Sequence, residues 1–192
     1  MGLESKTVAI IAADEFEDIE LEFPLLRLSE EGADILLVPV EGGLHTRPFC
    51  ESKPVTGRFG TPMPPMVMEE GNRYESRTLE ELKLDEIDCI LIPGGFSPDQ
   101  LRVNSDVIKL VSKAHKQGKL IAAICHGPQL LIEADIVDGR KVTSYEAVKT
   151  DLINAGGEYV DEPMVKDGNI LTSRVPDDLP QFCQEIAEAL SE

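Results

Sequence analysis

The sequence has little aromatic and little basic character. It contains no tryptophan and only three histidines, and its 36 acidic residues outnumber 18 basic ones. The net charge of -18 repels phosphate backbones, so we expect no nucleic-acid partner. No apolar run approaches the roughly 20 residues that a membrane helix needs, so we also expect no membrane partner. The opening MGLESKTVAI lacks the basic and long apolar regions of a signal peptide.

Cysteine is scarce and widely spaced. The four cysteines are Cys50, Cys89, Cys125 and Cys183. They form no CxxC pair, which favours a reducing, cytoplasmic setting. Cys89 lies in an apolar run and Cys183 in a helical pattern, so both are expected to be plain buried thiols. His45 and His115 have no companion at ligand spacing, and Gly94-Gly95 lacks the spacing of a phosphate loop, so we predict no metal and no cofactor.

Buried strands alternate with amphipathic helices along much of the chain. Short apolar runs typical of buried strands occupy 7–13, 33–40, 89–95 and 119–125, and helical patterns occupy 18–31, 104–117 and 128–134. This rhythm predicts an α/β fold, a flavodoxin-like, doubly wound, mostly parallel sheet with helices on both faces. The carboxyl ends of its strands should lie along one edge, where the sites of such sheets gather.

The remaining chain is expected to complete a single domain, residues 1–192. Short strands are predicted at 141–145 and 157–161, a hairpin at 164–173 and a closing helix at 177–190. The exception is a proline-rich excursion at about 41–70, which is too long for a simple connector. Its methionines favour a contact surface, so we expect a lid or an interface arm.

The stretch AAICHGPQLL joins a strand to a helix at Cys125. Pro128 is tolerated in the first turn of the helix, because the N–H that proline lacks would have no partner there. Small residues, Ala123 and Gly127, flank the cysteine two positions away on each side, as in a nucleophile elbow. The helix N-terminus should stabilise a thiolate there. The amide of His126, with amides near Gly94-Gly95, could donate hydrogen bonds to an oxyanion.

An acidic patch, DEFEDIE, follows the first strand. A carboxylate from this patch that approached Cys125 would have a raised pKa and could donate a hydrogen bond. For Glu15, Asp18 and Glu20 the expectation is exposure to water at a helix start. For Glu17 the residues alone leave the choice open.

Six segments carry a family resemblance. They are ADEFEDIELEFPLLRLSEEG, LIPGGFSPDQLR, AAICHGPQLL, GRKVTSY, DLINAGGEYVD and DGNILTSRVPDDLP. In this order they resemble the ThiJ/PfpI superfamily, specifically its PfpI-type intracellular protease/deglycase branch. The resemblance implies that Cys125 is the nucleophile, that His126 is the base, and that Glu17 is the acid that hydrogen-bonds the nucleophile.

Further roles follow from the same resemblance. Gly95 and the backbone of His126 match the oxyanion hole, and Tyr145 matches a tyrosine that lines the substrate site. The third triad member of the family is a glutamate from a neighbouring subunit; here that place holds Asp99, which is one methylene shorter but can also orient a histidine. The resemblance therefore implies self-association to a homodimer or a higher homo-oligomer.

Three functions stay open. The first is a cysteine-dependent hydrolase that acts on small peptide amides or glycated adducts. The second is a glutathione-independent glyoxalase that converts methylglyoxal to lactate, and the third is a redox-sensing stress protein or chaperone with an oxidised Cys125. His126 favours hydrolase or aldehyde chemistry, because redox sensing needs no base. A glutamine amidotransferase is excluded, since no histidine follows residue 126.

Overall fold

The structure is a computed structural model that describes residues 2–41, 54–65 and 73–192. The excursion predicted at 41–70 is therefore described only in part. His45, Cys50, Met66 and Met68 lie outside the described residues.

A seven-stranded sheet forms the centre of the molecule. Its strands are β1 (Thr7–Ala12), β2 (Asp34–Pro39), β5 (Glu75–Ser76), β6 (Cys89–Ile92), β7 (Leu120–Ile124), β10 (Met164–Asp167) and β11 (Ile170–Ser173). Their order is β10-β11-β7-β6-β1-β2-β5, and within the described sheet only β10 pairs antiparallel. The parallel strands β2-β1-β6-β7-β11 have the flavodoxin-like order, so the predicted fold class is confirmed.

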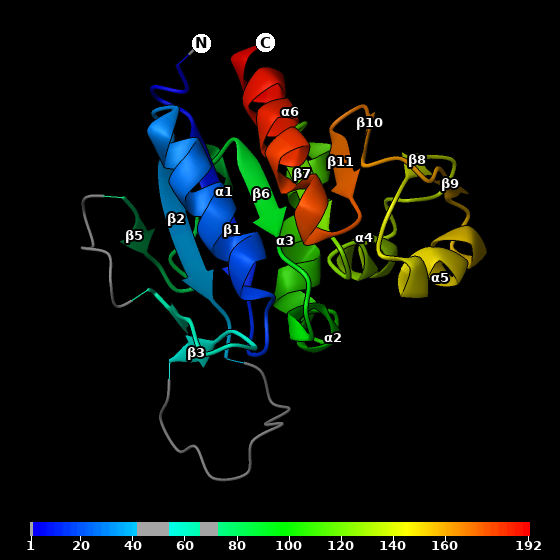
Figure 1. Cartoon of the computed structure of the whole chain (residues 1–192), viewed down its shortest axis with the longest axis horizontal. Helices are drawn as coiled ribbons and strands as arrows, with labels where there is room; N and C mark the ends of the chain where they lie inside the picture. The colour runs from blue at the N-terminus through cyan, green and yellow to red at the C-terminus, as the bar shows by residue number, and fades with distance from the viewer. Residues whose placement is uncertain (1, 42–53, 66–72) are drawn as a thin grey trace, which may run out of the picture.

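Helices cover both faces of this sheet (Figure 1). They are α1 (Asp18–Glu30), α2 (Ser97–Leu101), α3 (Ser105–Lys116), α4 (Gln129–Glu133), α5 (Lys149–Asn154) and α6 (Leu179–Ser191). The helices α1 and α6 lie side by side in front of the sheet, with α3 behind it (Figure 1). Alternate residues of β1 follow this division: Val8 and Ile10 belong to the core with α1 and α6, and Ala9 to the core with α3.

Smaller elements decorate the edges. The strands β3 (Val55–Thr56) and β4 (Pro62–Met63) form a hairpin, and β8 (Lys141–Val142) pairs with β9 (Glu158–Tyr159). Single 3-10 turns occupy Leu84–Glu86, Glu146–Val148 and Pro176–Asp178. The last of these turns precedes α6, so the closing helix begins two residues later than the sequence predicted. None of the described helices is long and apolar enough to cross a membrane.

Helix α1 determines which acidic side chains enter the core. Its buried residues include Glu20, Pro24 and Leu28, which are spaced by four and therefore share one face of the helix. The helix ends before Gly32, whose φ of +100° is a conformation that glycine adopts without a steric penalty. Glu20 is thus carried into the interior by the same periodicity that buries the apolar residues.

Candidate active site

The predicted nucleophile elbow is present between β7 and α4. Cys125 has a φ of +61°, in the left-handed region that a non-glycine residue adopts only under strain. The turn is tight, because the amide of Gly127 donates to the carbonyl of Ile124 at 2.8 Å. A Cβ on Gly127 would lie 2.6 Å from the carbonyl oxygen of Ile92, so glycine is required where β6 and the elbow meet.

Two further loops meet the elbow at the carboxyl edge of the sheet. The amide of Phe96 donates to the carbonyl of Glu15 at 2.7 Å, and Phe16 forms a bridge with Gly95, so the loops after β1 and β6 lie against each other. A Cβ on Gly94 would come within 2.7 Å of the Cβ of Cys125. These close approaches hold the backbone of the β6 loop directly against the cysteine.

The Cys125 sulfur faces two backbone amides and one imidazole. The amides of Gly95 and His126 donate hydrogen bonds to the sulfur, and both lower the pKa of the thiol. The sulfur lies 3.3 Å from Nδ1 of His126. These are the two amides that the sequence predicts as an oxyanion hole, and in the structure they lie within hydrogen-bond reach of the sulfur.

Glu20 is the carboxyl group beside the nucleophile. Its side chain is fully buried, its Oε2 accepts a hydrogen bond from the amide of Gly94 at 2.7 Å, and it hydrogen-bonds Cys125. The pKa of Glu20 is raised from 4.5 to about 7; burial is the largest cause, the hydrogen bond from the Gly94 amide opposes it, and the charge of Glu17 adds to it. The expectation that Glu20 faces water is therefore wrong.

Glu17 also lines the cavity, but its carboxylate pairs with an arginine. It is the residue before α1, and its Oε2 accepts an ion-paired hydrogen bond from Nη1 of Arg58 at 2.7 Å. The position expected for Glu17, next to the sulfur, is taken by Glu20. Glu17 and Glu20 lie one helical turn apart on the same side of α1, and Glu17, as the residue before the helix, reaches Arg58 instead of the sulfur. Helical periodicity with Pro24 and Leu28 places Glu20 on the buried face, but it does not separate Glu20 from Glu17, which stands four residues before the buried Leu21.

The thiol and the carboxyl group compete for ionisation. Burial is the largest cause that raises the pKa of Cys125 to about 12, followed by the charge of Glu20. The expected thiolate stabilisation by a helix dipole is weak here, because α4 has only five residues. A protonated Glu20 adds no such charge and can donate a hydrogen bond to the sulfur. Thiolate formation is consequently favoured while Glu20 holds its proton.

His126 is half-buried, and burial is the first cause that lowers its pKa from 6.5. The imidazole is therefore mostly neutral near pH 7 and can accept a proton from Cys125. The charge of Asp99 opposes this shift, but no hydrogen bond joins Asp99 to His126 within the described part of the chain. On the other side Tyr145 stacks on the imidazole, with ring centroids 5.1 Å apart.

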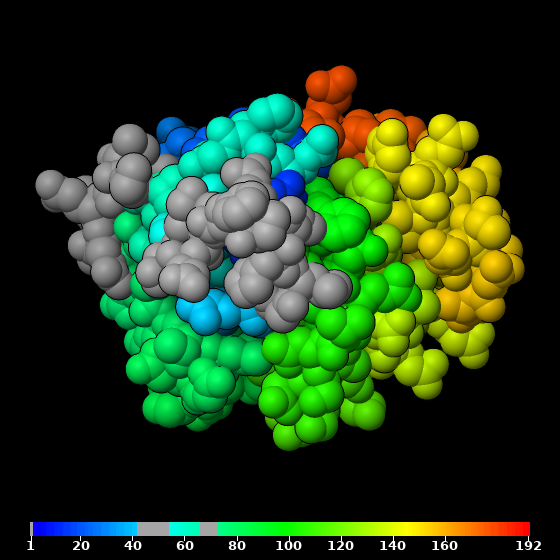
Figure 2. All heavy atoms as spheres, turned by 90° about the horizontal axis from the view of Figure 1, so that it is seen from below, coloured from blue at the N-terminus to red at the C-terminus, as the bar shows by residue number. Residues whose placement is uncertain are grey.

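A cavity of about 780 Å³ opens over the sulfur. The side chains and loops around it belong to Glu15, Glu17, Glu20, Arg58, Gly95, Phe96, Asp99, Cys125, His126, Gln129, Tyr145, Val175 and Pro176. All six residues proposed from the sequence thus line one cavity, and Asp99 does so from the same chain. Sequence reasoning missed four polar residues of this cavity, Glu15, Glu20, Arg58 and Gln129. Figure 2 views the molecule from the carboxyl ends of the strands, the edge at which the elbow lies.

The other described cysteines stay outside the site. Cys89 and Cys183 are buried, and burial raises the pKa of each thiol, as expected for plain core cysteines. In the described ranges no cluster of three or more histidine, cysteine or acidic side chains could hold a metal ion. The chemistry available in the cavity is that of a thiol, an imidazole and a buried carboxyl group.

A doubly wound sheet with a strained cysteine above its carboxyl edge defines a nucleophile-elbow protein of the α/β class. The DJ-1/PfpI family matches residues 6–189, and the chain belongs to this family. It is 36% identical over 183 residues to the deglycase PfpI of Pyrococcus furiosus, covering 95% of this chain and 98% of that protein. It is 35% identical over 187 residues to protein/nucleic acid deglycase 2 of Escherichia coli, covering 97% and 98%.

A solved structure gives the same result for the fold. The crystal structure of Drosophila melanogaster DJ-1beta superposes with a TM-score of 0.81 at 29% identity, covering 97% of this chain and 90% of that chain. The resemblance to the ThiJ/PfpI superfamily predicted from the sequence motifs is confirmed.

Proposed function

We propose that the chain is a cysteine-dependent hydrolase that cleaves the C–N bond of glycated adducts or small peptide amides. The observation that carries this proposal is the arrangement at Cys125, with the buried carboxyl group of Glu20 on one side of the sulfur and the neutral imidazole of His126 on the other. The deglycase names of the relatives from P. furiosus and E. coli support the same class of reaction.

For an amide, His126 takes the thiol proton and the Cys125 sulfur adds to the carbonyl carbon. The oxygen becomes an oxyanion, which the amides of Gly95 and His126 stabilise. The C–N bond then breaks, the amine leaves with the proton held by His126, and a thioester remains. Water adds to the thioester, the C–S bond breaks, and the acid and the free thiol are released.

For a hemiaminal between an amine and methylglyoxal, the net reaction consumes one water and releases the amine and lactate. The former aldehyde carbon is oxidised to the carboxylate level while the neighbouring ketone is reduced to an alcohol, so the adduct supplies its own oxidant and no external one is needed. The protonated carboxyl group of Glu20 has the same role in both reactions: it donates a hydrogen bond to the sulfur while the thiolate forms. Because the pKa of Glu20 is raised to about 7, this form is present through mildly acidic and neutral pH.

The test measures amine release from methylglyoxal adducts of amino acids and hydrolysis of small peptide amides. The enzymes are the wild type, Cys125→Ser and, as a matched control, Cys183→Ala, which removes a thiol outside the cavity. We expect the wild type and the control to release amine faster than the adduct dissociates spontaneously, and Cys125→Ser to fall to the uncatalysed rate. If the wild type released amine no faster than the adduct dissociates spontaneously, but consumed free methylglyoxal rapidly, the result would instead support the glyoxalase alternative.

Self-association is part of the same proposal. Ile19 and Leu26 are 42% and 46% exposed on the outer face of α1, and Phe59 is 79% exposed on the neighbouring hairpin. Exposed apolar side chains that gather near one face favour burial against another protein surface. We expect sedimentation velocity to give at least a dimer, and a strictly monomeric species with full turnover would contradict this part.

A further inference from the structure

The β3–β4 hairpin is the described part of the proline-rich excursion, and it is anchored to the start of α1. The buried carboxylate of Asp18 accepts hydrogen bonds from the amides of Phe59 and Thr61, each at 2.9 Å. The amide of Arg58 donates to the carbonyl of Phe16 at 2.9 Å. A Cβ on Gly57 would lie 2.6 Å from the Asp18 carboxylate, so the hairpin backbone is seated directly on it.

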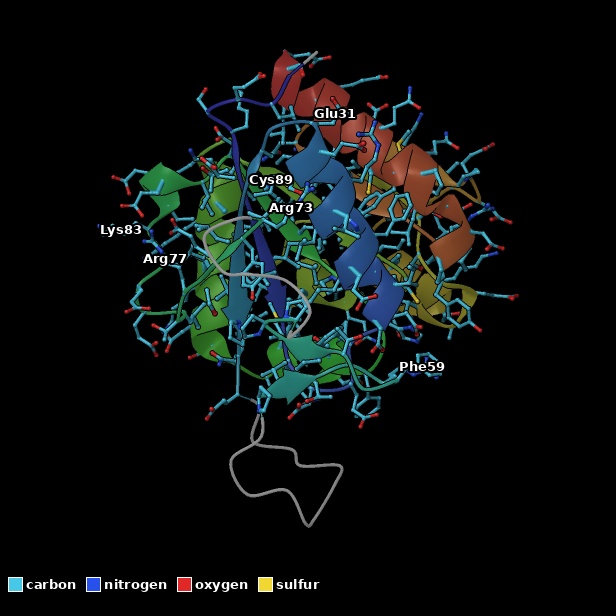
Figure 3. The ribbon with its side chains drawn as sticks, turned by 60° about the vertical axis from the view of Figure 1, so that its left-hand side comes forward. Glu31, Phe59, Arg73, Arg77, Lys83 and Cys89 are labelled. Carbon is cyan, nitrogen blue, oxygen red and sulfur yellow. The ribbon has the colours of Figure 1, made fainter. Side chains whose placement is uncertain are left out.

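This anchoring places two side chains in different environments. Phe59 lies at the rim of the molecule and points away from the sheet (Figure 3). Arg58 lines the cavity over Cys125, and its guanidinium lies 5.6 Å from the centre of the Phe59 ring. A guanidinium held between an aromatic ring and a carboxylate is preorganised at the mouth of the cavity.

Arg58 is the one permanently charged cation among the described residues that line this cavity, which also include four carboxyl groups. Glu17 accepts a hydrogen bond from Nη1 of the guanidinium, and half of the Arg58 side chain stays exposed. A guanidinium has five N–H donors, and within the described residues no other hydrogen bond or ion pair engages those of Arg58. Donors thus remain for a ligand that enters the cavity.

We infer that Arg58 determines specificity by binding a carboxylate of the substrate, so that the site prefers small glycated amino acids or peptides with a free carboxylate. This inference rests on the proposed function. The planar carboxylate matches the guanidinium fork, and it brings a single negative charge. The rim acids Glu15 and Asp99 disfavour more highly charged anions, while their charges suit the basic nitrogen of an adduct with an amine or guanidine.

The experiment uses a matched pair of substrates, the methylglyoxal adducts of Nα-acetylarginine and of its amide. The two share the reacting group and differ only in the free carboxylate. We expect the wild type to have a kcat/KM about tenfold or more higher for the acid, as a charge-assisted hydrogen bond provides. Arg58→Gln should bring the acid to the level of the amide, and Arg58→Lys should keep part of the preference.

The ratio between the two substrates separates recognition from a structural role. If Arg58→Gln lowered both substrates equally, or the wild type preferred the amide, the inference would be overturned. Arg77→Gln is the control, because Arg77 pairs with Glu75 and Glu86 away from the cavity (Figure 3) and should leave the ratio unchanged.

A binding measurement tests the inference even without turnover. Calorimetry measures the binding of Nα-acetylarginine and of Nα-acetylargininamide to two proteins. One carries Cys125→Ala alone, and the other carries Cys125→Ala together with Arg58→Gln. Tighter binding of the acid that disappears with Arg58→Gln supports the inference, and equal binding of both compounds contradicts it. If binding discriminates but the wild type turns over neither adduct, the proposed reaction fails while the role of Arg58 stands.

Discussion

Replacing Glu20 by glutamine tests the electrostatics of the site through the stability of the fold. The side chain is fully buried, and burial raises its pKa from 4.5 to about 7. Below pH 4.5 the carboxyl group is protonated in both the folded and the unfolded chain, so it makes no pH-dependent contribution. Between these two values the unfolded chain loses the proton and the folded chain keeps it, so stability falls as pH rises. Above pH 7 the carboxyl group is ionised in both states, and the free energy of unfolding stays lower by the full cost of the buried charge.

The size of this effect follows from the two pKa values. One pKa unit corresponds to about 1.4 kcal/mol, so ionisation of Glu20 costs about 3 kcal/mol of the free energy of unfolding. Glutamine stays neutral and can still accept the hydrogen bond from Gly94. We therefore expect Glu20→Gln to gain about 3 kcal/mol on the wild type between pH 4.5 and pH 8.

Urea unfolding of both proteins across this pH range measures the difference directly. Glu133→Gln is the matched control, because it removes a carboxylate that is ion-paired with Arg102 on the surface and does not contribute to the pKa of Glu20. A difference between wild type and Glu20→Gln that does not change with pH would refute the assignment of a buried, protonated carboxyl group.

Three further substitutions test the geometry. Tyr145→Ala should lower kcat/KM roughly fivefold by removing the ring that stacks on His126, whereas Tyr145→Phe keeps the ring and should retain turnover. Gly94→Ala places a methyl group against Cys125 and should lower kcat on the order of a hundredfold; undiminished kcat would contradict the close approach. Asp18→Ala leaves two hairpin amides unpaired and should cost about 2 kcal/mol in urea unfolding, with faster tryptic cleavage of the hairpin as the second readout.

Much of the fold was predictable because its long elements carry a strong periodic signal. The apolar runs at β1, β2 and β7 and the amphipathic α3 match the predicted segments within one residue at each end, whereas β6 ends three residues before its predicted segment. The five- and six-residue helices α2 and α5 were missed, since so few residues do not establish a period. The strands predicted at 141–145 and 157–161 shrink to two residues each, because they pair only with each other.

The site was predictable where its parts are adjacent in sequence. Cys125 and His126 lie in one motif with Gly127, a residue without a side chain of the kind that a tight turn requires. Glu20 was missed because the choice between it and Glu17 depends on where α1 begins, and a shift of one helical turn decides which carboxyl group is buried. Arg58 was missed for a different reason, since hydrogen bonds to Asp18 bring it to the site from a distant segment.

Alkylation of Cys125 followed by mass spectrometry tests the central claim most directly. Turnover of the adducts and the fraction of modified Cys125 are measured together during reaction with iodoacetamide. We predict that activity falls in proportion to the modification of Cys125, which is 8% exposed and lines the cavity. Cys89 and Cys183 are 0% and 1% exposed and lie outside the cavity, so they should stay unmodified in the folded protein. Complete modification of Cys125 with unchanged turnover would contradict the account.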